Sequence, residues 1–183
     1  MASKNKEILL GVTGSIAAYK ACDILRRLRD RDLGVTVIMT KEAAQLVTPL
    51  TFASLSGRKV YIEMFDQDTT SWEIDHVALA EKAEVLLIAP ATANVIGKLA
   101  NGIADDLLTC TAMATKAKIL IAPAMNTGMY ENIIVQENIT KLKKLGIGFI
   151  DPVKGKLACG TTGAGHLADV ETIVKTVEQA LKK

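Results

Sequence analysis

The sequence predicts one α/β domain built on a doubly wound, mostly parallel β-sheet. Short runs of consecutive apolar residues recur along the 183-residue chain, and stretches with helical periodicity separate them. A strand whose residues are all apolar, with no alternation of apolar and polar side chains, is buried on both faces. This is the case in a parallel sheet between two layers of helices. No internal repeat and no linker divides the chain, so we expect a single domain over residues 1–183.

The expected strands are the short apolar runs. Residues 8–12 form the first, and residues 35–39 form a second that is rich in β-branched side chains. Residues 84–89 and 118–122 are two more, and residues 146–150 are a fifth with a less regular pattern. Runs of this length between helical stretches are typical of the strands of α/β proteins.

Helices are expected between and after these strands. In residues 16–31 the apolar side chains recur at helical spacing on one face, and Gly34 follows as a stop signal. Further helices are expected at residues 41–56, 75–82, 93–114, 131–145 and 170–181. Two segments are predicted as loops, because residues 66–73 are polar and residues 151–165 contain four glycines. Loops at the carboxyl ends of parallel strands are where such sheets bind ligands.

Composition and charge exclude several classes of protein. Basic and acidic residues number 22 and 20, and the net charge of +2 offers no field for binding nucleic acid or a membrane surface. A hydrophobic content of 49% excludes a disordered chain. No apolar run approaches the length of a membrane span, and the run near the N-terminus is too short for a signal peptide. We therefore expect a cytoplasmic protein that acts on a small molecule.

Few side chains are available for acid–base or covalent chemistry. The cysteines, Cys22, Cys110 and Cys159, form no Cys-x-x-Cys pair, so we expect neither a metal site nor a disulfide framework, as in a reducing cytosol. Cys22 and Cys110 fall in apolar helical stretches and are predicted to be inert. Cys159 lies among glycines, where an accessible thiol could act as a nucleophile or a proton donor.

His76 is either a surface residue or a general base, and His166 either starts a helix or contacts a phosphate.

The first strand leads into a glycine-containing loop, Gly-Val-Thr-Gly-Ser at residues 11–15, and then into a helix. This order places backbone N–H groups and a hydroxyl at a helix N-terminus, where phosphate binds well. The structural alternative is a simple turn with Ser15 as the N-cap. The loop has neither the G-x-G-x-x-G fingerprint of dinucleotide sites nor the Gly-Lys-Ser/Thr of a P-loop. A mononucleotide such as FMN therefore remains open.

Two later strands end in the same way. Residues 88–94 and residues 121–126 each leave a buried strand through Ala-Pro-Ala and reach an asparagine, Asn94 or Asn126. Proline ends the strand ladder, and small side chains let a planar ligand approach the backbone. Each asparagine offers a donor and an acceptor, so the pair are either turn residues or ligand contacts.

Taken together, these motifs resemble those of the flavin-containing cysteine decarboxylases. They are GSIAAYK (residues 14–20), PATAN (90–94), PAMNTGMY (123–130) and ACGTTGAG (158–165), in order over nearly the whole chain. The resemblance is closest to the members that decarboxylate 4′-phosphopantothenoylcysteine to 4′-phosphopantetheine in coenzyme A biosynthesis, and it implies a Rossmann-like or flavodoxin-like fold. Thr92 stands where the family often has serine, which keeps the hydroxyl. Many bacterial relatives carry a fused ligase domain, and we expect this chain to be a free-standing decarboxylase.

The resemblance also implies roles for individual residues. FMN would be bound by Gly14, Ser15 and Ile16 around its phosphate, with Thr40 nearby, and by Ala91, Thr92, Ala93 and Asn94 near the ring. Substrate would contact Asn126, Met125, Ala158 and Gly160. His76 would be the base, Asn126 would hold the substrate carboxylate, and Cys159 would donate the final proton. Residues 151–165 would form a lid, and trimers, or dodecamers built from them, would place the flavin at the subunit contact.

This set of groups suits the implied chemistry. Oxidation of the substrate's CH₂–SH by flavin gives a thioaldehyde whose C=S bond accepts the electrons of the departing CO₂, leaving an ene-thiol that is then reduced. A flavin prenyltransferase would not need both the PAMN and the ACG motifs. A peptidyl-cysteine decarboxylase would share His76 and Asn126, and a non-catalytic flavoprotein subunit would often lack His76 or Cys159.

Overall fold

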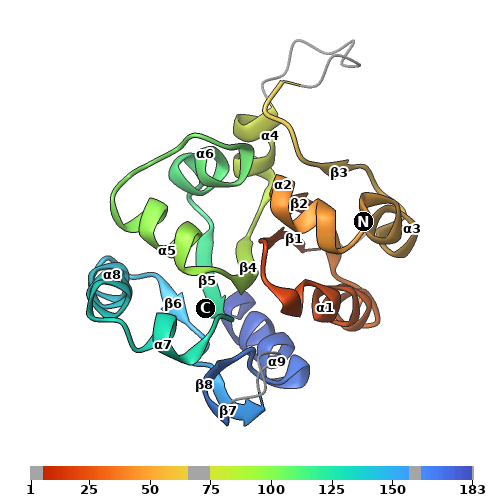
Figure 1. The fold of residues 1–183 in the computed structure, drawn as a ribbon. Coiled ribbons are helices and arrows are strands. Elements are labelled where there is room, and N and C mark those ends of the chain that lie inside the picture. The colour runs from red at the N-terminus through yellow and green to blue at the C-terminus, as the bar shows by residue number, and fades with distance from the viewer. Residues whose placement is uncertain (1–5, 66–74, 157–161, 183) are drawn as a thin grey trace.

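The computed structural model describes residues 6–65, 75–156 and 162–182, and a six-stranded sheet lies at its centre. The sheet order is β3-β2-β1-β4-β5-β6, and every neighbouring pair is parallel (Figure 1). The strands are β1 (Glu7–Val12), β2 (Gly34–Met39), β3 (Val60–Tyr61), β4 (Val85–Ala91), β5 (Lys118–Pro123) and β6 (Gly148–Phe149). This arrangement confirms the predicted doubly wound parallel sheet, and its strand order is the Rossmann order.

The helices follow the predicted segments, but the longest of these are interrupted. They are the 3₁₀ helix η1 (Ile16–Tyr19), α1 (Lys20–Arg29), α2 (Lys41–Leu46), α3 (Pro49–Ser56), α4 (Asp75–Lys82), α5 (Ala93–Ala100), α6 (Leu107–Ala114), α7 (Thr127–Tyr130), α8 (Ile133–Lys144) and α9 (Val170–Leu181). The prediction of one helix over residues 41–56 is wrong because Pro49, which has no N–H, starts a second helix. The prediction over residues 93–114 is wrong because Gly102 adopts a positive φ and Asp106 begins α6 with a capping box.

The predicted loop at residues 151–165 is in part a β-hairpin. Strands β7 (Val153–Lys156) and β8 (Thr162–His166) form a separate antiparallel pair. Sequence reasoning assigned the glycines here to a loop, but they permit close packing, since a Cβ at Gly163 would collide with the Thr127 side chain. The predicted loop at residues 66–73 lies outside the described residues.

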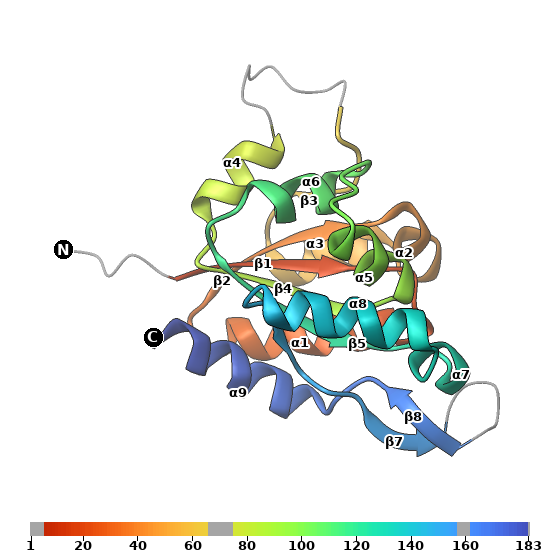
Figure 2. The same ribbon diagram turned by 90° about the vertical axis from the view of Figure 1, so that its left-hand side faces the viewer.

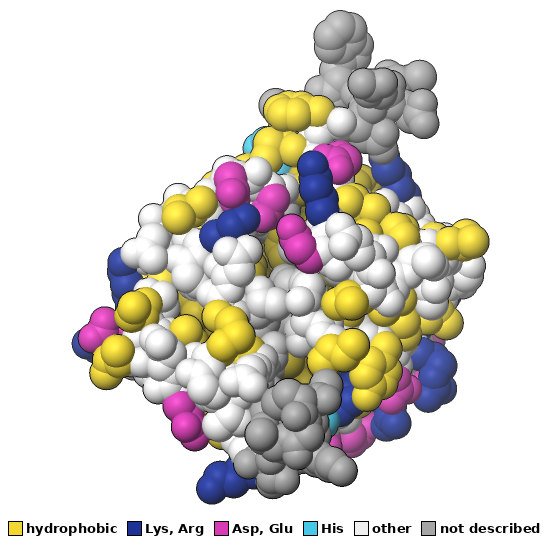
Figure 3. Space-filling view, viewed as in Figure 1, with side chains coloured by type: hydrophobic (Ala, Val, Ile, Leu, Met, Phe, Trp, Pro, Cys, Tyr) yellow, Lys and Arg dark blue, Asp and Glu magenta, His cyan; other side chains and the backbone are white. Residues whose placement is uncertain are grey.

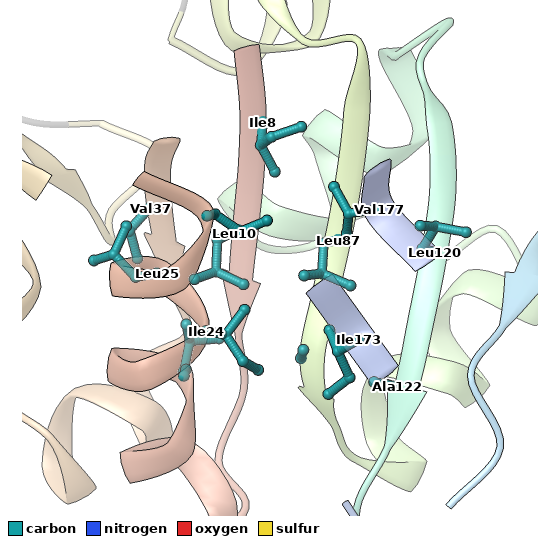
Figure 4. Packing of buried hydrophobic residues seen from close by; sticks show 14 of the residues in the cluster. Ile8, Leu10, Ile24, Leu25, Val37, Leu87, Leu120, Ala122, Ile173 and Val177 are labelled. Carbon is teal, nitrogen blue, oxygen red and sulfur yellow. The ribbon is translucent and has the colours of Figure 1, made fainter. Parts of the chain in front are cut away.

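Helices cover both faces of the sheet. Figure 2 shows α1 and α9 on one side and α4 and α6 on the other. On the first side, Ile24 of α1 and Ile173 of α9 pack with Leu10 and Leu87 of the two central strands (Figure 4). On the second side, Leu86 and Ile88 of β4 belong to a core shared with α5, α6 and α8. None of the helices in the described part of the chain combines the length and hydropathy needed to cross a membrane.

Leu87 gives a test of this core, because its side chain is fully buried between β1, β5 and the α1/α9 layer. We expect Leu87→Ala to lower the free energy of unfolding by about 2–5 kcal/mol, through lost burial and the cavity left behind. Urea unfolding followed by circular dichroism measures the change. Leu50 is 74% exposed, and the control Leu50→Ala should change stability by less than about 0.5 kcal/mol. Equal effects of the two substitutions would contradict the assignment of the core.

Candidate active site

The site begins where β1 and β4 lie side by side at the centre of the sheet. The helices that follow these two strands leave to opposite faces, and in doubly wound sheets such a switch point opens a crevice at the carboxyl ends of the strands. Figure 1 views the molecule from this end of the sheet. In Figure 3, hydrophobic and uncharged groups cover the middle and lower part of the same face, while charged side chains gather toward its upper part and its rim.

Thr13 joins the two strand ends. Its Oγ1 donates to the carbonyl of Pro90 at 2.7 Å and accepts from the N–H of Thr92 at 3.0 Å, and the residue is buried. One hydroxyl from the loop after β1 therefore satisfies both the Pro90 carbonyl and the Thr92 N–H at the end of β4. Sequence reasoning missed Thr13, although a hydroxyl placed between a buried strand and a glycine is the signal that could have found it.

The loop after β1 forms the predicted helix N-terminus. Ser15 is the N-cap of η1, with its Oγ accepting from the N–H of Ala17 at 3.4 Å, and η1 runs directly into α1. The first N–H groups of a helical segment have no partner within it and favour an anion. Gly14 is required here because a Cβ at this position would lie 2.5 Å from the Cβ of Glu42 on α2. The turn with Ser15 as N-cap is thus confirmed, and phosphate binding at this helix N-terminus stays a prediction.

The exits of β4 and β5 form the second wall. Thr92 caps α5 by accepting from the N–H of Val95, and Asn126 caps α7 with its Oδ1 accepting from the N–H of Gly128 at 2.8 Å. The Ala124 N–H donates to the carbonyl of Ala91 at 3.0 Å, which holds the two exits together.

The β-hairpin supplies the third wall. The Met125 N–H donates to the carbonyl of Gly165 at 3.0 Å. Gly165 has a φ of 120°, and any Cβ here would collide with the Met125 carbonyl, so only glycine fits. The next residue, His166, faces Lys20 at the start of α1, with 2.8 Å between His166 Nε2 and Lys20 Nζ.

These walls enclose one cavity of about 580 Å³, a size common for sites that bind small molecules and cofactors. It is lined by Gly14, Ser15, Ile16, Ala17, Tyr19, Lys20, Thr92, Ala93, Ala124, Met125, Asn126, Met129, Gly165, His166 and Leu167. Seven of the predicted residues line this one cavity, namely Gly14, Ser15, Ile16, Thr92, Ala93, Met125 and Asn126, and their roles in binding stay predictions. Tyr19, Met129 and Leu167 also line the cavity, and the sequence motifs had not predicted a role for them.

Other predicted residues lie elsewhere. Ala91 is buried within β4, where it pairs with Pro123, and Asn94 is exposed on α5 outside the cavity lining, so the two Ala-Pro-Ala exits are not equivalent. Thr40 caps α2 and lines a second cavity of about 240 Å³, which also contains Lys98. Ala158, Cys159 and Gly160 lie outside the described residues.

His76 also lies away from the cavity. It is the second residue of α4, and Figures 1 and 2 both place α4 at the opposite end of the molecule from α7 and the hairpin. Its Nδ1 is buried and has no hydrogen-bond partner among the residues that the structure describes. Within one copy of the chain, His76 and Asn126 are therefore not brought together.

Three further ionisable groups have pKa shifts with structural causes. Burial raises the pKa of the Cys22 and Cys110 thiols, which keeps them protonated and agrees with their predicted inertness. Beside the second cavity, Lys98 donates hydrogen bonds to the carboxylates of Asp105 and Asp106, which raises its pKa above the ordinary value. No cluster of three or more metal-ligating side chains occurs in the described ranges.

Known proteins resemble this chain over nearly its whole length. The family model described as Flavoprotein matches residues 1–182. A probable phosphopantothenoylcysteine decarboxylase of Streptococcus mutans is 46% identical over 178 residues, which cover 96% of this chain and 99% of that protein. The coenzyme A biosynthesis bifunctional protein CoaBC of Bacillus subtilis is 49% identical over 175 residues, which cover 96% of this chain. The chain spans 43% of the length of that bifunctional relative.

Solved structures show the same fold. A mutant PPC decarboxylase complexed with pantothenoylaminoethenethiol has a TM-score of 0.87 at 31% identity, covering 98% of this chain and 100% of the other. The FMN-dependent cysteine decarboxylase SpaF has a TM-score of 0.82 at 32% identity, covering 96% and 97%.

The bridge made by Thr13 can be tested by removing its hydroxyl. Thr13→Val keeps the side-chain shape but leaves the Pro90 carbonyl and the Thr92 N–H without their buried partner. We expect a loss of about 1–3 kcal/mol in the free energy of unfolding, together with weaker retention of any bound cofactor. Urea unfolding and absorbance of the purified protein measure the two effects. Thr13→Ser keeps the hydroxyl and should retain most of both, and a Val variant as stable as this Ser control would contradict the bridge.

Proposed function

This chain belongs to the Flavoprotein family, and from that membership and the cavity we propose that it is an FMN-dependent decarboxylase that converts 4′-phosphopantothenoylcysteine to 4′-phosphopantetheine. The observation that carries the proposal is the convergence of a helix N-terminus at Gly14 and Ser15, the small residues Thr92 and Ala93, and the amide of Asn126 on one cavity. The helix N-terminus suits a phosphate, the small residues leave room for a planar ring, and the amide suits a carboxylate. We place the enzyme in the cytoplasm and in coenzyme A biosynthesis.

The residues present fit FMN. Ser15 and the adjoining helix N-terminus supply the donors that a phosphate needs. Gly14 has no side chain, which lets the backbone of this loop pack closely against Glu42. Thr92 and Ala93 leave a wall without bulky side chains, against which a ring can lie. When bound, FMN supplies the two-electron acceptor that makes the substrate's C–S bond able to take up the electron pair released with CO₂.

Asn126 is suited to the carboxylate that leaves. Its Oδ1 accepts from the Gly128 N–H, which holds the side chain at the cavity wall, and an amide N–H is a donor that suits a carboxylate. A neutral amide holds the carboxylate by hydrogen bonds alone. A cation in the same place would stabilise the charged ground state against its loss as neutral CO₂.

His76 and Cys159 complete the proposed machinery. His76 is the proposed base and Cys159 the proposed proton donor of the final reduction. Because α4 lies far from α7 in one copy of the chain, we propose that His76 reaches the cavity of a second copy. Ile16 and Tyr19 at the cavity are 63% and 61% exposed, and large apolar side chains of this exposure favour burial against a neighbouring subunit. Trimers, or dodecamers built from them, would meet this requirement.

The direct test of the activity is incubation of the yellow, FMN-loaded protein with 4′-phosphopantothenoylcysteine. We expect mass spectrometry to show product that has lost CO₂, and denaturation to release FMN. A peptide ending in cysteine is the comparison substrate. A colourless protein that FMN cannot reconstitute would contradict the proposal that FMN is the cofactor. Turnover of the peptide alone would favour a peptidyl-cysteine decarboxylase.

Asn126→Asp separates the binding of the carboxylate from the folding of the site. Aspartate is a good N-cap, so α7 should form as before, but its negative charge opposes the substrate carboxylate. We expect kcat/KM to fall at least about 100-fold, since like charges in a binding site cost several kcal/mol. Steady-state kinetics measure this, with FMN absorbance as the control for an intact site. Retained activity would show that Asn126 does not bind the carboxylate.

A mixing experiment tests whether two copies share a site. His76→Asn and Asn126→Asp should each be inactive alone. If His76 acts in the cavity of a neighbour, co-expression of the two variants should restore about a quarter of the wild-type activity, because random assembly pairs two intact residues at that frequency. Activity is measured as CO₂ release by the co-purified mixture. A mixture that forms oligomers but stays inactive would place both residues in one chain's site.

A further inference from the structure

Lys20 and His166 form a pair in the wall of the cavity that the reaction proposed above does not use. Lys20 Nζ lies 2.8 Å from His166 Nε2, and both side chains line the same cavity as Ser15 and Asn126. Lys20 opens α1 and His166 ends β8, so the fold brings together residues 146 positions apart.

The pair is built into the structure. Gly165, with its φ of 120°, and the hydrogen bond from the Met125 N–H fix the backbone immediately before His166. The Lys20 ammonium has only donors to offer, and an imidazole nitrogen can accept from it, so the two side chains can hold each other in place. The imidazole and the ammonium thus face the cavity in a fixed relation.

Within the described ranges, no carboxylate pairs with Lys20. Other partly buried cations differ in this respect: Lys98 contacts Asp105 at 2.7 Å and Asp106 at 2.9 Å, and Arg31 contacts Glu171 at 2.9 Å. A lysine that lines a cavity beside an imidazole, without an acidic side chain, is an anion-binding arrangement.

The proposed reaction brings an anionic group that the residues described so far leave without a site. The helix N-terminus at Ser15 suits the phosphate of FMN, and Asn126 suits the substrate carboxylate. The substrate also carries a 4′-phosphate at its far end. We propose that Lys20 and His166 form the subsite for this phosphomonoester, and so make the enzyme selective for phosphorylated substrate. This inference rests on the proposed function and adds to it the residues that determine specificity.

The test compares two substrates that differ only in the phosphate. For Lys20→Met, we expect the preference for 4′-phosphopantothenoylcysteine over pantothenoylcysteine, measured as a ratio of kcat/KM, to fall about 100-fold through a rise in KM. His166→Gln should lower the ratio less, and Lys20→Arg should restore part of it. Lys175→Met removes the same charge from the exposed face of α9 and serves as the control. An unchanged ratio in Lys20→Met overturns the subsite.

Flavin content separates this subsite from one for FMN. If Lys20 and His166 instead bind the phosphate of FMN, the Lys20→Met protein should lose flavin during purification and turn over both substrates equally poorly, which also overturns the proposal. Calorimetric titration of the FMN-loaded wild type with 4′-phosphopantothenate and with pantothenate measures phosphate recognition without turnover. Lys20-dependent preference for the phosphorylated ligand, in a protein that releases no CO₂ from either substrate, would support the subsite and contradict only the decarboxylase function.

Discussion

The hydroxyl of Thr13 is the interaction on which the site depends. Parallel strands β1 and β4 bring their carboxyl ends together, but their following loops diverge to opposite faces of the sheet. Thr13 connects the loops by donating to Pro90 and accepting from Thr92. The N-termini of η1 and α5 therefore keep a fixed spacing, so the two ends of the cofactor site proposed above are held in a preformed arrangement.

Much of the fold could be predicted because burial on both faces leaves a clear pattern. The apolar runs located five strands of the sheet, and the bounds predicted for α4 and α9 agree with the structure. The pattern could not show where helices break, since apolar side chains continue on both sides of Pro49 and Gly102. The β7–β8 hairpin was missed for a different reason: its strands pack against α7 through glycines and bury few apolar side chains.

The site was predictable to the extent that its residues lie in contiguous motifs. Ser15, Thr92 and Asn126 each cap a helix directly after a strand, so their place in the sequence determines their place at the sheet edge. Lys20 and His166 were recognisable as ionisable residues, but their contact depends on how the hairpin folds back onto α1. His76 shows the opposite limit, because its place in the sequence did not indicate that α4 lies at the other end of the molecule from Asn126.

The walls of the cavity also set an order on its completion during synthesis. One wall comes from the loop at residues 14–16, but the opposite wall comes from residues 124–126, Met129 and residues 165–167. A nascent chain that has not yet passed β8 has the helix N-terminus at Ser15 and lacks part of the facing wall. The cofactor site proposed above is therefore complete only after residues 165–167 have been synthesised, later than all six strands of the sheet.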